Sequence, residues 1–558
     1  MKKSINILMA GAFVAATMGL TSCDDFLKEK PLDAKASTEF WKTADDAESG
    51  VAALYFGGVP YLNNAGGGWQ PKATMYGGII SGLYYDDHGD SQLAEASKNC
   101  MFNMEKFTSS AMTLWHEFYK GISRANFVLE NVPKMTSVLD KATIDNYVAQ
   151  GKFFRAYAYF YLVKEFGDVP YVTKPYTSTE GMFVERTPAA EVYKNIIDEL
   201  TPLAEGTALP QKSFYDNGCR VTRAMAQTLL AEVYLQRAGF PCNGGDADYK
   251  QAAKYAEMVI SGGTAELEQK NGSSDDLNSA YNVIKNSKTS KEIIYAKEYD
   301  YSNQKIGNGY VNLCMGTDAT TWKDANGKSL FKMNVMHKAY QPSDIILNSY
   351  ADNDVRGMEK QFFFKNWTDA TGVTHTLDYP GIWAWFEETA ITDGTSGDNN
   401  IPTMRYAEVL LIAAEGYART GETAKAEGLL NQVRKRAGLP NYSASVNGDL
   451  VKAILTERLH EFPVEFKIWD DIRRTRLYPE AIMVKIIVEK EDGTKEEKIV
   501  QKQDILEWTP LASAKIQNKP VDNVKVGALP EYVLLWPIPQ DEMQRNPALE
   551  GHQNPGWN

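Results

Sequence analysis

The sequence predicts a mostly α-helical body in which paired helices form a scaffold and irregular, loop-rich segments are inserted between them. Two observations predict this class. Apolar residues recur at three- and four-residue spacing in successive segments, which is the period of amphipathic helices. Two long segments, about 57–110 and 261–402, break this period with clustered glycine and aromatic residues. Irregular segments of this length are usually functional.

The first residues have the composition of an export signal. Lys2 and Lys3 precede an uncharged apolar run over residues 5–20, and small residues then lead to Cys23. The run is too short for a typical membrane span and fits a signal peptide. Residues 20–23 resemble the lipobox of bacterial lipoproteins, which implies cleavage before Cys23 and acylation of that cysteine. The alternative is an ordinary secretory signal in which the cysteine is incidental.

These segments define the predicted domain organisation. Residues 1–22 form the lipoprotein signal peptide, residues 23–32 the lipidated cysteine and its tether, and residues 33–558 a single body. Within the body, the helical scaffold occupies about 33–56, 111–260 and 403–480. The loop-rich ligand-binding insertions are 57–110 and 261–402, and a hairpin and tail complete the chain over 481–558.

Helix pairs account for the scaffold. The periodicity predicts helices over about 37–55, 114–132, 143–166, 188–203, 222–238, 249–260, 404–420, 423–437 and 450–461. The pair at 404–437 turns at Gly421-Glu422 and alternates bulky residues with alanine on its facing stripes. This matches the helix-turn-helix unit of about 34 residues called the tetratricopeptide repeat. Three or four such pairs would stack into a curved scaffold.

Only minor β-structure is expected. Residues 292–296 form a short strand-like run, and apolar residues alternate with polar ones at 483–488 and 497–500. The segments 483–488 and 497–500 flank Asp492-Gly493, and this arrangement predicts a β-hairpin. Near the C-terminus, residues 535–539 and 554–557 are too rich in proline for a helix.

Composition excludes several classes of function. The formal net charge is −13 and no run of lysine and arginine occurs, so a nucleic-acid partner is not expected. No later apolar run approaches the roughly 20 residues of a membrane span. Cys219 and Cys242 bracket a predicted helix of about 27 Å, which is too long for a disulfide between them.

No motif indicates an enzyme, a metal or a cofactor. The six histidines lack HExxH spacing, and neither a GxSxG motif nor a P-loop occurs. No Cys/His cluster has zinc spacing, and Asp352 and Asp354 lack the closing glutamate of a calcium loop. Composition does not exclude a pair of carboxylates that hydrolyses glycosides, because the chain has 72 acidic residues. No motif identifies such a pair. We therefore expect a non-catalytic protein without a metal or cofactor.

Five blocks of residues, in order along the chain, resemble the SusD/RagB family of outer-membrane nutrient-binding lipoproteins. They are CDDFL at 23–27 with Pro31 and Phe40-Trp41, RAYAYFYL at 155–162 with FGDVP at 166–170, RYAEVLL at 405–411 with Ala414-Glu415, Glu457-Arg458 with Glu461-Phe462, and WPIP at 536–539 with Asn546-Pro547 and NPG at 554–556. The chain departs from the family at residues 464–474. There VEFKIWDDIRR stands in place of a phrase like EGxRWxDLRR, and the glycine and first arginine are replaced.

The resemblance implies a function as well as a fold. The family has four tetratricopeptide-like units, with the insertions folded over them as the ligand surface. Its members are lipid-anchored in the outer membrane, facing the exterior, as lids on a TonB-dependent, SusC-like transporter. They bind oligosaccharide and pass it inward, although some relatives capture peptides. Two hypotheses therefore remain open: non-catalytic glycan binding, or the same architecture capturing peptides or another non-glycan nutrient.

Aromatic residues in the two insertions are the candidate ligand contacts. Sugar rings stack on tryptophan and tyrosine, and their hydroxyls bond to carboxylates, so such a surface needs aromatic side chains exposed on loops. The candidates are Trp69, Tyr84 and Tyr85 with Asp86 and Asp87 as hydroxyl partners in the first insertion, and Trp322 and Tyr340 in the second, with Trp383 and Trp385 less favoured. The alternative for each ring is a buried anchor that holds a loop on the scaffold.

Overall fold

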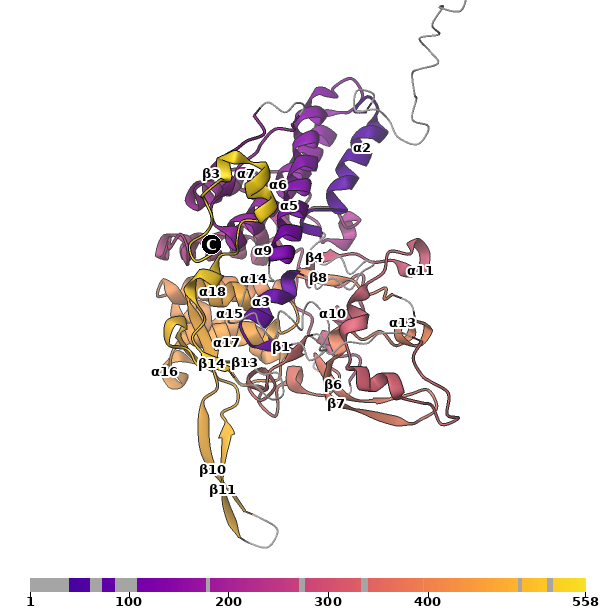
Figure 1. The fold of residues 1–558 in the computed structure, drawn as a ribbon, viewed down its shortest axis with the longest axis vertical. Helices are drawn as coiled ribbons and strands as arrows, with labels where there is room; N and C mark the ends of the chain where they lie inside the picture. The colour runs from indigo at the N-terminus through magenta and orange to yellow at the C-terminus, as the bar shows by residue number, and fades with distance from the viewer. Residues whose placement is uncertain are drawn as a thin grey trace, which may run out of the picture.

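The computed structural model describes residues 40–60, 73–85, 108–176, 181–269, 276–332, 340–394, 396–489, 494–518 and 525–557. The fold is mostly helical, as predicted (Figure 1). The helices are α2 (Ala44–Ala52), α3 (Ala73–Ile80), α5 (Thr108–Asn131), α6 (Lys141–Phe166), α7 (Ala189–Glu205), α8 (Arg223–Ala238), α9 (Asp246–Gly262), α10 (Ala280–Asn286), α11 (Tyr301–Gln304), α12 (Asp344–Leu347), α13 (Glu388–Asp393), α14 (Tyr406–Arg419), α15 (Thr423–Arg436), α16 (Ala444–Asn447), α17 (Leu450–Glu461), α18 (Ile468–Thr475) and α19 (Gln540–Arg545).

The scaffold is a row of helices in which each packs against the next. Helices α5 to α9 contact one another in sequence order, α9 contacts α14, and α14 contacts α15 and α17. Residues 263–405 separate α9 from α14, so the second insertion leaves the helical row and returns to it. This arrangement is the tetratricopeptide-like architecture that the sequence predicts.

A glycine allows α14 to approach α9 closely. A Cβ atom on Gly416 would lie 2.6 Å from the Tyr249 carbonyl oxygen and 2.9 Å from the Cβ of Ala253. Ala413 of α14 and Ala426 of α15 are fully buried, and these two helices pack against each other. The small residues that suggested the repeat are therefore the ones at close helix crossings.

Helix α2 begins later than predicted. The Thr43 hydroxyl accepts a hydrogen bond from the Asp46 N–H at 3.1 Å, and the Asp46 carboxylate accepts one from the Thr43 N–H at 2.9 Å. This capping box starts the helix at Ala44. Trp41 has a positive φ of 69°, and the described residues 40–43 before the helix are not helical.

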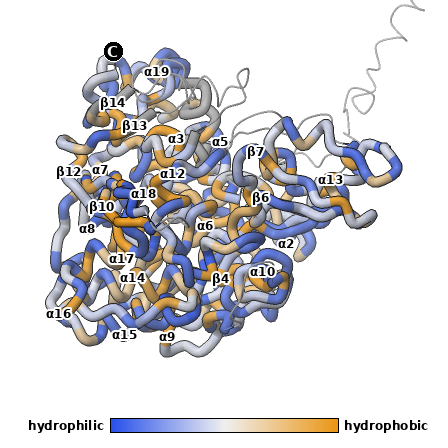
Figure 2. The backbone as a smooth tube through the Cα atoms, turned by 90° about the horizontal axis from the view of Figure 1, so that it is seen from below, coloured by the Kyte–Doolittle hydropathy of each residue, from blue (hydrophilic) through white to orange (hydrophobic). Residues whose placement is uncertain are grey.

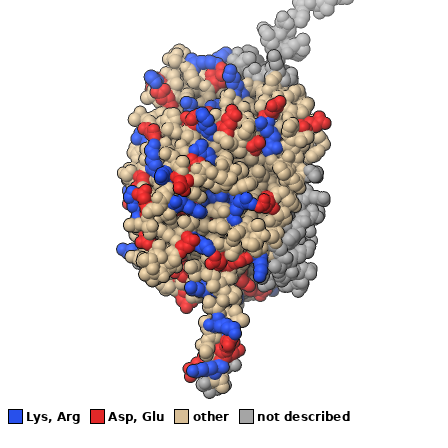
Figure 3. All heavy atoms as spheres, turned by 90° about the vertical axis from the view of Figure 1, so that its left-hand side faces the viewer, with Lys and Arg blue, Asp and Glu red and all other residues tan. Residues whose placement is uncertain are grey.

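The strands of the described residues form two-stranded antiparallel sheets. The pairs are β1 (Tyr84–Tyr85) with β5 (Gln341–Pro342), β2 (Val169–Pro170) with β3 (Arg186–Thr187), β4 (Ile293–Lys297) with β8 (Ile401–Arg405), β6 (Phe363–Thr368) with β7 (Thr374–Ile382), β9 (Leu477–Glu480) with β12 (Glu507–Pro510), β10 (Met483–Glu489) with β11 (Lys495–Gln501), and β13 (Ile516–Asn518) with β14 (Lys525–Gly527). The predicted hairpin at 483–500 is β10–β11, and it projects from the body (Figures 1 and 3).

Ion pairs occupy the centre of the scaffold. Arg405 at the end of β8 donates to Glu292 at 2.6 Å, to Glu461 at 2.9 Å and to Glu465 at 2.7 Å. Arg436 of α15 bonds the same Glu292 and Glu461 carboxylates. Burial opposes ionisation of Glu461, but Arg436 and Arg405 outweigh it and hold the pKa of that carboxyl below its usual value.

A second buried group of charges connects α14, α17 and α18. Arg474 donates two hydrogen bonds to Glu415, at 2.7 and 2.6 Å, and Asp471 accepts from both Arg474 and Arg458. Against the cost of burial, Arg474 lowers the pKa of Glu415 to about 2. Arg405, Glu415, Glu457-Arg458 and Glu461, which carried the family resemblance, thus lie in the charged interior rather than on a ligand surface.

No helix among the described residues is long and apolar enough to cross a bilayer. The predicted signal peptide and Cys23 lie outside those residues.

Candidate ligand-binding site

The structure brings the two insertions together. Strand β1 of the first insertion pairs with β5 of the second, in a register that places Tyr84 opposite Pro342. The Tyr84 ring also stacks on Tyr340, with 4.1 Å between ring centroids and 11° between ring planes. Two of the predicted contact residues are therefore neighbours.

Tyr84 and Tyr340 are nevertheless core residues. Each side chain is about 1% exposed, and the Tyr84 hydroxyl donates to the Pro463 carbonyl. Burial raises the pKa of both hydroxyls. A Cβ atom on Gly78 would lie 2.1 Å from the Tyr340 hydroxyl, so α3 packs directly against these two rings at Gly78. Their prediction as exposed stacking surfaces is wrong, and they are anchors that join the loops to the scaffold.

Trp383 and Trp385 are also buried, with 7% and 3% of their surface exposed. The Trp383 indole donates to the Asn282 side chain at 2.7 Å. Both rings therefore anchor the second insertion and present no free surface. The side chains of Trp69, Tyr85, Asp86 and Asp87 lie outside the described residues.

Among the candidates whose side chains the structure describes, Trp322 is the one with a partly accessible ring. It follows the short helix η7 (Thr317–Thr321) and is half-buried. One face is stacked on His375 of β7, with 4.8 Å between centroids and 18° between planes, and Trp367 of β6 lies nearly parallel at 6.3 Å. Figure 2 shows that β6 and β7 belong to a lobe that stands out from the helical body.

Hydrogen bonds hold the rings behind Trp322. The His375 Nε2 lies 2.9 Å from Asp369 Oδ2, and Asp369 Oδ1 accepts from the N–H groups of Thr371 and Val373. Desolvation opposes ionisation of Asp369, but the hydrogen bonds from Thr371, His375 and Val373 keep its pKa well below the usual value. The Trp322 carbonyl accepts from the Leu330 N–H at 3.2 Å, which closes its own loop.

We call Trp322, Trp367, Asp369 and His375 the Trp322 platform. The supporting residues were not predicted, because their contribution depends on the pairing of β6 with β7. A signal exists in the sequence: apolar Trp367 and Leu377 alternate with polar neighbours around Thr371-Gly372. A partly exposed ring with a fixed back face can stack on the flat C–H face of a sugar or on an apolar side chain.

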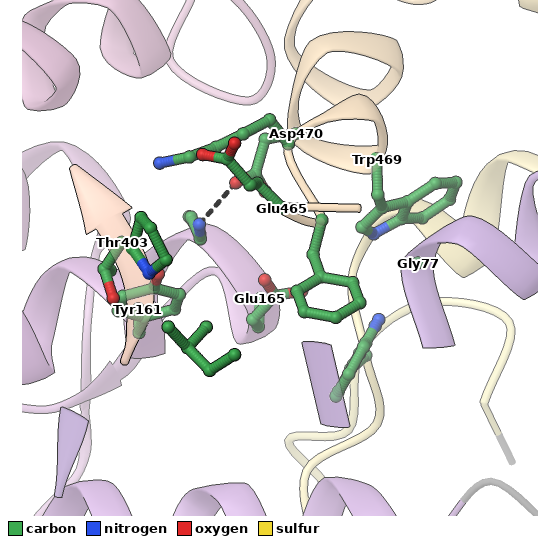
Figure 4. A pocket seen from close by; sticks show the side chains of 13 residues that line it. Gly77, Tyr161, Glu165, Thr403, Glu465, Trp469 and Asp470 are labelled. Atoms are coloured by element: carbon green, nitrogen blue, oxygen red, sulfur yellow. Dashed lines mark hydrogen bonds and ion pairs between the residues drawn. The ribbon is translucent and has the colours of Figure 1, made fainter. Parts of the chain in front are cut away.

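A separate polar pocket lies where α3, α6, β8 and α18 meet, and is lined by Gly77, Lys164, Glu465 and Trp469, among others (Figure 4). The volume of this pocket that is available to the centres of water molecules is about 40 Å³. This space holds a few waters but no sugar ring. The Lys164 ammonium lies 2.5 Å from Asp470, so the pocket belongs to the charged interior.

Family models match most of the chain. The model described as the SusD family matches residues 291–557. A second model, described as starch-binding associating with outer membrane, matches residues 53–235. The second match covers α5 to α7 and most of α8, and the first covers α14, α15, α17 and most of the second insertion. Residues 236–290, which include α9, lie outside both matches.

Individual relatives match this chain over most of their own length. SusD-like protein P2 of Formosa agariphila is 26% identical over 492 residues, covering 83% of this chain and 90% of the relative. The starch-binding protein SusD of Bacteroides thetaiotaomicron is 23% identical over 540 residues, covering 85% of this chain and 91% of the relative.

Solved structures share the fold. A SusD superfamily protein from Parabacteroides distasonis superposes with a TM-score of 0.72 at 23% identity, covering 94% of this chain and all of that one. Surface glycan-binding protein A of Bacteroides thetaiotaomicron, in complex with laminarihexaose, superposes with a TM-score of 0.63 at 20% identity, covering 92% of this chain and all of that one. With its helical tetratricopeptide-like scaffold and these matches, the chain belongs to the SusD-like family.

Proposed function

We propose that this protein binds oligo- or polysaccharide without catalysis and delivers it to a TonB-dependent, SusC-like transporter. It acts at the outer membrane, anchored through acylated Cys23 and facing the cell exterior. The description of the second family model and the laminarihexaose complex of a related fold support glycan binding at that membrane. The lipobox-like residues before Cys23 support the anchor.

The observation that carries the proposal is the Trp322 platform. Its ring is partly exposed on a lobe of the second insertion, while most other predicted rings that the structure describes are core residues. The stack with His375 fixes the ring plane before ligand arrives, so little conformational entropy is lost on binding. Trp69, Tyr85, Asp86 and Asp87 are proposed as further contacts from the first insertion.

Isothermal titration calorimetry on residues 24–558 with a panel of oligosaccharides tests this function. We expect binding of at least one glycan without release of product, the latter checked by chromatography. Trp322→Ala should weaken that binding at least about tenfold, or about 1.4 kcal/mol. Phe183→Ala is the matched control, because Phe183 is 62% exposed and adjoins β3, on the opposite side of the molecule from β6 and β7 (Figure 1).

Each part of the proposal has its own contradicting result. Binding of peptides and of no glycan would assign the protein to the peptide-capturing alternative. Glycan binding that Trp322→Ala leaves unchanged would exclude the Trp322 platform but not the function. Product formation by the purified protein would contradict a non-catalytic role, and membrane retention of a Cys23→Ala variant would contradict the anchor.

A further inference from the structure

Three potential metal ligands meet where the C-terminal segment contacts the scaffold. His116 lies on α5, and Asp541 and Glu542 lie on α19. The His116 Nε2 is 3.3 Å from Asp541 Oδ2 and 2.9 Å from Glu542 Oε1, and the three ligand atoms lie within 4.8 Å of one another. All three side chains are half-buried, so the cluster is accessible to an ion from solvent.

This spacing matches ligands that share one cation. Nitrogen and oxygen ligands bind Zn²⁺ at about 2.0–2.2 Å, which places ligands in tetrahedral positions about 3.4 Å apart. The two distances from His116 lie close to that value. One imidazole and two carboxylates form a donor set used for first-row divalent metals, with zinc prominent among them. Three protein ligands leave a coordination position for water.

The carboxylates are incompletely neutralised by protein groups. Asp541 Oδ1 is enclosed and has no hydrogen-bond partner among the residues that the structure describes. Among the described residues, Arg545 is the arginine beside these carboxylates. It lies 3.2 Å from Asp541 and 3.6 Å from Glu542. Its side chain is 68% exposed, and exposed pairs of this kind contribute little. The Asp541 oxygen that faces His116 is Oδ2. A cation held by both Asp541 oxygens together with Glu542 and His116 would also satisfy the enclosed Oδ1, and it would displace the exposed Arg545.

We propose that His116, Asp541 and Glu542 bind a divalent first-row cation of the Zn²⁺ class. The site links α5 to α19, and its ligands His116 and Glu542 are 426 residues apart in the chain. Because these ligands come together only in the folded chain, the metal stabilises the attachment of the C-terminal segment to the scaffold. The site is distant in sequence from the Trp322 platform and does not depend on glycan binding.

Calorimetric titration of residues 24–558 with ZnCl₂ at pH 7.5 tests the site, with MgCl₂ and CaCl₂ for comparison. We expect one equivalent of Zn²⁺ to bind and to raise the melting temperature. His116→Ala and Glu542→Gln should each weaken binding at least about tenfold. His552→Ala, which changes another histidine of the same C-terminal segment, should leave the affinity unchanged.

Circular dichroism checks that both variants are folded. We expect them to fold, because the side chains of His116 and Glu542 are partly exposed. Absence of stoichiometric Zn²⁺ binding by the wild-type chain would overturn the proposal. So would an unchanged affinity in folded His116→Ala and Glu542→Gln, because the bound ion would then occupy other ligands, such as the half-buried thiols of Cys219 and Cys242.

Discussion

At the scale of single residues, the buried charged side chains have the largest expected effect on stability. Arg405, Arg436 and Arg356 all contact the Glu461 carboxylate, and all four side chains are at most 1% exposed. Burying these charges costs free energy, which their mutual attraction and hydrogen bonds offset. Removing one partner leaves the opposite charges buried and uncompensated.

We therefore expect Glu461→Gln to lower the free energy of unfolding by about 3–5 kcal/mol. Urea denaturation followed by circular dichroism measures this loss. The control is Asp198→Asn, which breaks an exposed pair with Lys194 and should cost at most about 0.5 kcal/mol. A loss below about 1 kcal/mol in Glu461→Gln would contradict a stabilising role for the buried charges.

His460 predicts a dependence of stability on pH. Burial, with a smaller effect from Arg356, lowers the pKa of His460 to about 3, below the value of about 6.5 for an unfolded histidine. Protonation therefore favours the unfolded chain. The contribution of His460 is fully present above about pH 6.5 and is lost as the pH falls towards 3, by up to about 1.4 kcal/mol per pH unit.

Unfolding free energies measured between pH 7 and pH 4 test this expectation. His460→Gln retains a polar group beside the Ser349 hydroxyl, which lies 2.7 Å from His460 Nε2. Its stability should fall less steeply with acid than that of the wild-type chain, although buried carboxylates such as Glu415 contribute to both curves. Equal slopes for the two proteins would show that the pKa of His460 is not lowered in the folded chain.

At the scale of elements, the two long hairpins differ in how they attach to the body. The β6–β7 hairpin buries Phe364, Trp367 and Leu377 against the second insertion. The β10–β11 hairpin instead exposes Ile487 and Ile499 by 72% and 64%. Its two strands pair with each other over seven residues each. Where the hairpin joins the body, the Lys502 N–H donates a hydrogen bond to the Ile482 carbonyl.

We expect deletion of residues 484–500, with a Gly-Ser-Gly bridge, to leave the melting temperature within about 3 °C of wild type. The reason is that little apolar surface of this hairpin is buried on folding. Differential scanning calorimetry measures the change. The matched deletion of residues 365–376 in β6–β7 should lower the melting temperature clearly, and equal effects of the two deletions would contradict this assignment.

At the scale of the whole molecule, the C-terminal segment closes the fold against its N-terminal half. The Trp536 N–H donates to the Glu165 carbonyl of α6 at 2.7 Å. The Asn554 amide donates to the carbonyls of Phe166 and Trp536, at 2.9 and 2.6 Å. Arg186 joins the same junction through the His552 carbonyl. Distant parts of the chain are thus held together by backbone and side-chain groups of the last two dozen residues.

Truncation after Leu534 should therefore destabilise the entire protein. It removes the buried side chains of Trp536, Ile538, Leu549 and Trp557, each worth about 1.5–3 kcal/mol. We expect a loss of about 5 kcal/mol or more and rapid cleavage in limited proteolysis. Glu550→Ala, an exposed change in the same segment, is the control, and a truncated chain as resistant as wild type would contradict this closing role.

The sequence by itself determined most of the scaffold helices, the repeat-like pair at 404–437, the β10–β11 hairpin and the family, whereas α3 and α18 were not predicted. These features depend on residues close in the chain: apolar period, caps such as Asp140 before α6, and short turns. The positions of the family motifs were equally readable. Their buried ion pairs were not, because the partners of Arg405 lie up to 113 residues away.

Only the tertiary structure decided which candidate residues are accessible. Tyr84 and Trp322 are both aromatic residues in glycine-rich insertions, and nothing local distinguishes them. Tyr84 is buried because Tyr340 and Pro463, remote in sequence, cover it, whereas one face of Trp322 is backed by β7. The cluster of His116 with Asp541 and Glu542 arises in the same way. Burial and ligand geometry depend on contacts between distant segments, which a local sequence pattern does not encode.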